Sequence, residues 1–222
     1  MATRIAILLS ILGGYVDTLS FLTLQGLFAA HVTGNFVTLG AALVLSRSGI
    51  TAKLLALPMF CLMIVLSRLL GHRLAKAGRA PLPIMFGVMV VLFAGATALA
   101  FAFGPFTSGD SWMALVTGMV LVSAMAIQNG AQRVHLPKLP PSTLMTGSTT
   151  QAMLDVADLI VGNAGEERGV ISARLQKLGV SILSFAFGCG LAALVIHFGG
   201  MWGYALPPFF AAGLLFLRAE KI

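Results

Sequence analysis

The sequence predicts an all-α protein, a polytopic membrane helix bundle that forms a single transmembrane domain over residues 1–222. Three observations support this fold class. Hydrophobic residues make up 58% of the chain and charged residues only 9%, whereas soluble domains carry about 25% charged residues. The apolar residues form runs about as long as the roughly 20 residues that cross a hydrocarbon core. A short phrase, Thr-Gly followed by a polar residue, occurs at residues 33–35 and again at 146–148.

Eight apolar segments can be drawn along the chain. Six of them have membrane-crossing length or nearly so, and they cover residues 5–24, 54–70, 82–104, 112–131, 178–197 and 201–217. The other two, residues 32–46 and 147–161, would reach only about 22 Å as helices. Both short segments begin at the repeated Thr-Gly phrase. We therefore predict about six crossings and two short helices that are broken or re-entrant.

The basic residues test this number of crossings and set the orientation. With six crossings and a cytoplasmic N-terminus, every Lys and Arg except Arg47 and Lys53 falls on the cytoplasmic side. The positive-inside rule favours this arrangement over eight crossings, which divide the charges more evenly. A version in which residues 32–46 cross fully and the N-terminus lies outside ranks second. The net charge of +7 is explained by the basic residues that orient the chain in the membrane. We therefore expect membrane lipids as partners and no binding of nucleic acid.

The two short segments predict an inverted internal repeat. Repeat one covers residues 5–70 and repeat two covers 112–197, and the helices 82–104 and 201–217 follow them. With six crossings, the first helix of repeat one runs outward and the first helix of repeat two runs inward. Many secondary transporters are built from such repeats, with broken helices that meet near the bilayer midplane.

Several chemistries have no motif in this chain. Cys61 and Cys189 stand alone inside apolar runs, where they are typical packing residues. There is no HExxH or other metal spacing and no Walker loop. We therefore expect no metal, no cofactor and no enzymatic activity.

Two stretches of the chain carry a resemblance to a known family. Residues 13–21, Gly-Gly-Tyr-Val-Asp-Thr-Leu-Ser-Phe, and residues 30–35, Ala-His-Val-Thr-Gly-Asn, resemble the YoaK family of bacterial membrane proteins, also called domain of unknown function 1275. Residues 126–133 and 143–147 agree with it, although Ser148 stands where the first phrase has Asn35. The resemblance implies a bacterial inner-membrane protein with about six spans. It implies no settled activity. The charge distribution, with six crossings, predicts that both termini are cytoplasmic.

The polar residues near the two phrases are the candidates for substrate binding. Backbone N–H groups at helix starts near Gly34 and Gly147 would attract an anion or a polar solute edge. Asp17 lies deep in the first span, where an ionisable group is a functional candidate by default and a potential proton carrier. The full predicted set is Asp17, His31, Thr33, Gly34, Asn35, Gln128, Asn129, Thr146, Gly147, Ser148, Gln151 and Asp155.

Each candidate also has a purely structural interpretation. The glycine phrases could be tight packing breaks, and Asp17 could hydrogen-bond a broken segment and only hold the fold. Arg133 is expected to snorkel to the interface. Asp155 could pair with a cation or with Arg133, and Asp158 is expected to mark the cytoplasmic end of its segment.

The preferred function is a secondary transporter or facilitator of a small polar or charged solute, for which Asp17 offers proton coupling. An ion or solute channel is the main alternative, and a membrane-embedded lipid-modifying enzyme or a scaffold ranks lower. The charge of the solute stays open, because helix starts favour an anion while Asp17 and Asp155 favour a cation. A homodimer would suit so small a chain.

Overall fold

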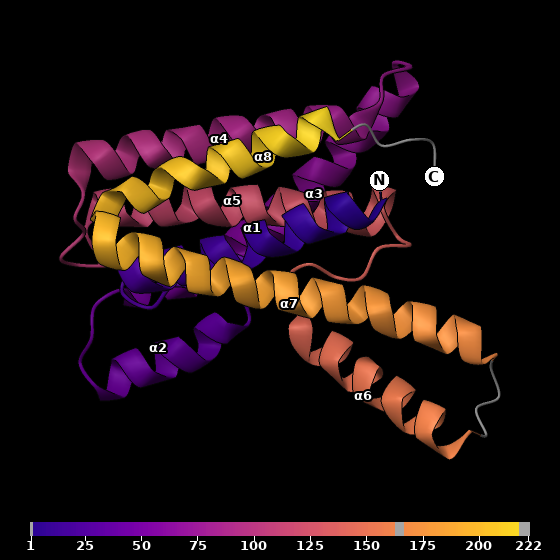
Figure 1. Ribbon diagram of the computed structural model, residues 1–222. Helices are drawn as coiled ribbons and strands as arrows, with labels where there is room; N and C mark the ends of the chain where they lie inside the picture. The colour runs from indigo at the N-terminus through magenta and orange to yellow at the C-terminus, as the bar shows by residue number, and fades with distance from the viewer. Residues whose placement is uncertain (1, 163–166, 218–222) are drawn as a thin grey trace.

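The computed structural model describes residues 2–162 and 167–217 (Figure 1). Every regular element in these ranges is helical, which confirms the predicted all-α class. The elements are α1 (Ala2–Thr23), α2 (Gly34–Val44), α3 (Ile50–Lys76), α4 (Pro81–Phe103), α5 (Trp112–His135), α6 (Met145–Val161), α7 (Arg168–Gly199), the 3₁₀ helix η1 (Gly200–Ala205) and α8 (Leu206–Phe216).

Five stretches of the described chain are helical, long and apolar enough to cross a membrane. Four of them are α1, α3, α4 and α5, and the fifth runs from Arg168 to Phe216. This last stretch contains α7, η1 and α8, and the chain reverses at η1, so that α8 runs antiparallel to α7 (Figure 1). These lengths and compositions support the membrane class.

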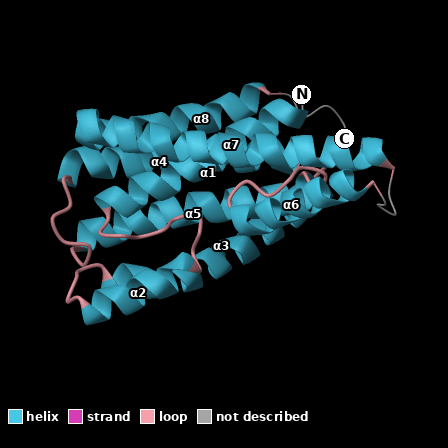
Figure 2. Cartoon of the chain, turned by 60° about the horizontal axis from the view of Figure 1, so that its bottom comes forward, coloured by secondary structure: helices cyan, strands magenta, loops and turns pink. Residues whose placement is uncertain are grey.

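The two short helices are α2, with 11 residues, and α6, with 17. Both are shorter than the roughly 20 residues that a crossing needs. Each begins near the middle of the bundle's length, and the two point toward opposite ends (Figures 1 and 2). The helix starts at the two Thr-Gly phrases therefore lie at a similar depth in the bundle.

The long helices pack as a bundle in which α1 and α5 are the most buried. The helix pairs in contact are α1 with α5, α7 and α8; α4 with α3, α5 and α8; α3 with α5; α2 with α3; and α6 with α7. The chain ends of α1 and α8 lie at the same end of the bundle (Figure 1). Large apolar side chains face outward on the outer helices, including Leu62 on α3, Val91 on α4 and Phe187 on α7, as lipid contact requires.

Asp110 joins the loop between α4 and α5 to the start of α3. Its carboxylate accepts hydrogen bonds from the Gly49 amide at 2.8 Å and from the Thr51 amide at 3.1 Å. Desolvation by itself would raise the pKa of Asp110. The bonds from the Gly49 and Thr51 amides, a Thr51 side-chain bond and the charge of Lys53 outweigh it and hold the pKa below its ordinary value. A carboxylate at a helix start is also favoured by the helix dipole.

We expect Asp110 to make stability depend on pH in the acid range. Because its pKa is lower in the folded state, its contribution is present at neutral pH and is lost as the pH falls below about 4. In Asp110→Asn, the melting temperature at pH 7 should therefore fall below that of the wild type. The two proteins should converge as the buffer approaches pH 3. A constant difference between pH 7 and pH 3 would contradict this role.

Candidate functional site

Asp17 lies buried in α1, with 4% of its surface exposed, and holds the loop that leads to α2. Its Oδ1 accepts hydrogen bonds from the Ala30 amide at 2.7 Å and the His31 amide at 3.2 Å, and its Oδ2 accepts from the His31 amide at 3.1 Å. The carboxylate thus satisfies two backbone amides of the loop, ahead of the helix start near Gly34 at which the sequence predicted an anion.

Asn35 closes the same loop from the first turn of α2. It is 1% exposed, its Oδ1 accepts from the Phe28 amide at 2.9 Å, and its Nδ2 donates to the Phe28 carbonyl at 2.8 Å. The amides of Gly34 and Asn35 donate to the carbonyls of His31 and Val32 at 2.9 and 3.1 Å. The amide hydrogens predicted to be free at this helix start are therefore already bonded within the protein.

The remaining predicted residues of the first phrase lie at the edge of this loop. His31 is half-buried, and its ring lies 6.0 Å from that of Phe28, centroid to centroid. Thr33 is exposed, occupies the N-cap position of α2 and makes no side-chain cap bond. Gly34 packs near the Phe28 ring. These contacts organise the loop.

In the second half of the chain, amide side chains of α5 hold the segment ahead of α6, as Asp17 of α1 holds the loop ahead of α2. Gln128, fully buried, donates from Nε2 to the Leu9 carbonyl and to Ser142 Oγ, both at 3.0 Å. Asn129 Oδ1 accepts from Thr143 Oγ1 at 2.7 Å. Each half of the chain therefore uses the polar residues of its first helix to hold the segment ahead of its short helix.

Gln132, one turn further along α5, was not in the predicted set and completes this network. Its Oε1 accepts from Ser142 Oγ at 2.5 Å, and its Nε2 donates to the Pro140 carbonyl at 2.6 Å. From α7, Ser181 Oγ donates to the Pro141 carbonyl at 3.2 Å and shares a 2.8 Å bond with Ser10 of α1. The prolines leave these carbonyls in an extended segment, where side chains must satisfy them.

The second phrase begins a helix that no side chain caps. Thr146 and Gly147 are exposed, whereas Ser148 is buried and its Oγ lies 3.5 Å from the Leu144 carbonyl oxygen. The two phrases thus differ in their surroundings, as the exchange of Asn35 for Ser148 suggested.

Asp155 is fully buried between α6 and α7. Its carboxylate accepts from Arg174 Nη2 at 2.6 Å and Arg174 Nε at 2.9 Å, and from Gln151 Nε2 at 2.8 Å. The alternative that Asp155 pairs with Arg133 is wrong, because α7 supplies the cationic partner, the guanidinium of Arg174. Asp158, one turn later, is exposed near the end of α6.

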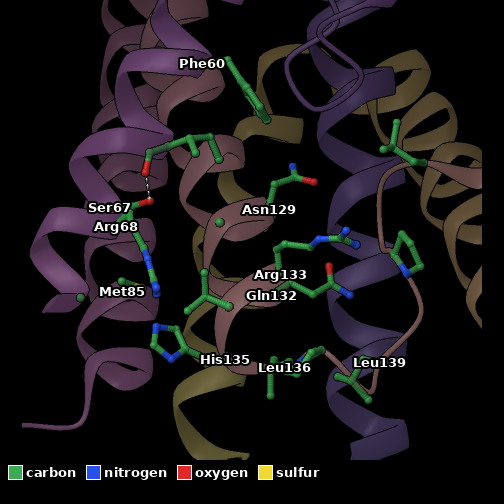
Figure 3. Close-up of a pocket in the computed structure, with 17 residues that line it drawn as sticks. Phe60, Ser67, Arg68, Met85, Asn129, Gln132, Arg133, His135, Leu136 and Leu139 are labelled. Atoms are coloured by element: carbon green, nitrogen blue, oxygen red, sulfur yellow. Dashed lines mark hydrogen bonds between the residues drawn. The ribbon is translucent and has the colours of Figure 1, made fainter. Parts of the chain in front are cut away.

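A cavity of about 740 Å³ lies between α3, α5 and the segment that joins α5 to α6. Of the predicted site residues, only Asn129 lines it. Its apolar wall includes Phe60, Ile64, Met85, Leu139 and Leu144. Its polar lining, labelled in Figure 3, is Ser67, Arg68, Asn129, Gln132, Arg133 and His135.

The cavity is basic. Arg133 projects from the same side of α5 as Asn129 and Gln132, and Arg68 and His135 lie together on the other side of that helix (Figure 3). Neither Arg68 nor Arg133 makes a hydrogen bond or ion pair with any residue in the described ranges, and no acidic residue is among those that line the cavity. The sequence did not predict Arg68 and His135 as site residues. Arg68 counted only toward the orientation in the membrane, and His135 was expected at the membrane interface because it lies at a helix end.

The comparison with known families confirms the resemblance noted in the sequence around the two Thr-Gly phrases. The family described as "Protein of unknown function (DUF1275)" matches residues 5–217. The chain belongs to this family. No curated protein and no solved structure matches the chain. The DUF1275 match thus covers both Thr-Gly phrases and all the helices described above except residues 2–4 of α1, and the activity must be argued from their geometry.

Proposed function

We propose that this DUF1275 protein is a transporter or facilitator of a small solute, built from two inverted repeats, α1–α4 and α5–α8. The helix contacts support this symmetry. The two repeats correspond when α1, α2, α3 and α4 are matched with α5, α6, α7 and α8. Under this match the α1–α7 contact corresponds to α5–α3, the α1–α8 contact to α5–α4, and the α2–α3 contact to α6–α7. Each of these pairs is in contact. The α1–α5 and α4–α8 contacts map onto themselves.

Six crossings follow from this arrangement, formed by α1, α3, α4, α5, α7 and the η1–α8 unit. The chain ends of α1 and α8 lie at one end of the bundle (Figure 1). Basic residues such as Arg68, Arg133 and Arg174 belong to the same end, which we place in the cytoplasm by the positive-inside rule. We place the protein in the bacterial inner membrane.

One asymmetry between the repeats carries the proposal. At the α1–α7 interface, a Cβ on Gly14 would overlap the Phe185 carbonyl oxygen, and a Cβ on Gly188 would overlap that of Ile11. The equivalent interface, between α3 and α5, instead borders the basic cavity. The helices α3 and α5 are also in contact, where Gly130 lies beside Ser67, so the two interfaces differ by the cavity that opens beside the second one. Such a difference between equivalent interfaces is what alternating access requires of a carrier.

Transport also suits the lining better than catalysis does. A membrane enzyme for lipids needs an acid–base pair or a metal close to its substrate. The described residues around the cavity include one histidine and no carboxylate. The proposal therefore places binding, and no bond-breaking step, in this cavity.

Thiol accessibility tests alternating access without knowledge of the solute. Native Cys189 is half-buried at the closed interface, with its Sγ 3.1 Å from where a Cβ of Gly14 would lie. Val134 lines the open cavity and is 38% exposed. Two single-cysteine proteins are needed, Cys61→Ser and the triple variant Cys61→Ser, Cys189→Ser, Val134→Cys. Each is treated with a membrane-impermeant maleimide in vesicles of either orientation.

We expect the cysteine at position 134 to react quickly from the cytoplasmic side and Cys189 to react slowly, from the opposite side. The slow rate would report the minor, outward-open population. Equal and simultaneous reactivity of both positions from both sides would indicate a channel. Complete protection of Cys189 from the opposite side would contradict alternating access.

A further inference from the structure

We propose that the basic cavity binds an amphiphilic organic anion, with its anionic group at Arg133 and its apolar body against the α3 wall. This inference rests on the proposed function, because it names the class of solute that such a carrier would take. Binding itself can still be measured without transport.

The charges of the cavity favour an anion. Arg133 has no hydrogen-bond or ion-pair partner among the described residues, and neither has Arg68 across the cavity. Both arginines are exposed, so their guanidinium groups are accessible to a ligand. A carboxylate, sulfonate or phosphate oxygen would form charge-assisted hydrogen bonds with such a group. Arg68 adds a second positive charge, which favours an anion further and a cation less.

The polar neighbours of Arg133 do not compete for its guanidinium. Asn129 donates to the Met125 carbonyl at 2.9 Å and accepts from Thr143, while Gln132 is bonded to Ser142 and Pro140. Their side chains are already satisfied. The network holds the segment beside Arg133 in place, and the guanidinium is left as the available donor group.

The size and the walls of the cavity favour an apolar body over a bare inorganic ion. About 740 Å³ lies within the range of roughly 300–1,000 Å³ that small-molecule sites occupy. Phe60, Ile64, Met85 and Leu144 line it from three elements. A hydrated phosphate or chloride would leave this surface without a contact, whereas an aromatic or aliphatic anion would bury it.

The position of the cavity connects such a ligand to the carrier cycle. It lies at the α3–α5 interface, whose counterpart α7–α1 is in close backbone contact. For α3 and α5 to pack as closely, an occupant must be enclosed or released. The ligand would thus bias the equilibrium between the two arrangements by its different affinity for each.

Equilibrium dialysis of radiolabelled benzoate and 2-naphthoate against the full chain in phosphatidylcholine nanodiscs tests the proposal. Both should bind, and 2-naphthoate should bind more tightly because it buries more apolar surface. Arg133→Gln should weaken binding by about tenfold or more, the loss expected for a charge-assisted hydrogen bond. Arg68→Gln should weaken it less, and Arg79→Gln, which changes an exposed arginine outside the cavity, should have no effect.

Competition gives the outcomes that overturn the proposal. Benzylamine has nearly the shape of benzoate and the opposite charge, so it should not displace benzoate. Displacement by benzylamine, failure of both anions to bind, or equal binding by Arg133→Gln and Arg79→Gln would each reject the anion site.

A second arm identifies the source of the anion. Nanodiscs that contain phosphatidylglycerol should leave benzoate binding unchanged if the occupant is a soluble solute. Displacement of benzoate by phosphatidylglycerol, lost in Arg133→Gln, would assign the site to a lipid head group and support its anion chemistry. Benzoate binding together with permanent protection of Cys189 would keep the anion site and reject transport, so the two proposals fail separately.

Discussion

Gly188→Ala is expected to prevent α7 from packing normally on α1. A methyl group at this position would overlap the backbone carbonyl of Ile11, and a backbone atom cannot move aside as the end of a flexible side chain can. Overpacking in a tight core typically costs about 1–3 kcal/mol. We expect a loss at the upper end of that range or beyond it, because two helix backbones must separate. Thermal unfolding in detergent and the yield of monodisperse protein measure it.

Gly190→Ala is the matched control on the same helix. No atom lies within 4 Å of where its Cβ would be, and replacing glycine by alanine in a helix stabilises it by up to about 1 kcal/mol. Gly14→Ala should resemble Gly188→Ala, since its Cβ would overlap the Phe185 carbonyl from the other side of the interface. Equal melting temperatures for Gly188→Ala and Gly190→Ala would show that the α1–α7 contact is looser than described.

Asp17→Ala is expected to release the loop ahead of α2. The carboxylate accepts from the amides of Ala30 and His31, and a buried donor left without a partner costs about 1–3 kcal/mol. Losing both acceptors should therefore lower stability by about 2–5 kcal/mol. Asp17→Asn keeps one acceptor oxygen and should lose less. Melting temperatures give the order, and hydrogen exchange at residues 30 and 31 locates the effect.

Thr33→Ala is the control for the Asp17 variants, because Thr33 is exposed and makes no cap bond. Its stability should stay within about 0.5 kcal/mol of the wild type. Wild-type stability of Asp17→Ala would refute the role of Asp17 in holding the loop.

If Asp17 also carries a proton, Asp17→Asn should fold and lose uptake driven by a pH gradient while exchange of labelled solute continues. Retained pH-driven uptake in Asp17→Asn would remove Asp17 from the coupling.

The long helices and the starts of the short ones could be predicted from single residues and their spacing in the sequence. The lengths of the apolar runs predicted which segments are long helices, because crossing a bilayer demands a fixed number of apolar residues. The Thr-Gly phrases predicted the starts of α2 and α6, since glycine and small polar residues interrupt an apolar run. The structural interpretation of Asp17, a bond to the broken segment, also matches the geometry.

The partners of the polar residues could not be predicted in the same way. Asp155 had two candidate partners in the sequence, and its actual partner, Arg174, lies on a helix that returns beside α6. The spacing of Ser184, Gly188 and Ala192 predicts a face of α7 that packs on another helix. Only the structure shows that its partner is the backbone of α1 at Ile11 and Gly14. Which carbonyl or guanidinium lies nearest depends on helix rotation and crossing, and no local pattern encodes these.

What the sequence by itself determined is the membrane class, the helix lengths and the duplicated polar breaks, since each follows from hydropathy and spacing along the chain. Only the tertiary structure decided where charge is left unsatisfied. It bonds Asp17 and Asp155 to groups of the protein and leaves Arg133 beside a cavity. The reason is physical. Hydrogen bonds and ion pairs act over a few ångströms, so the partner of each polar group is determined only when helices distant in the sequence have packed together.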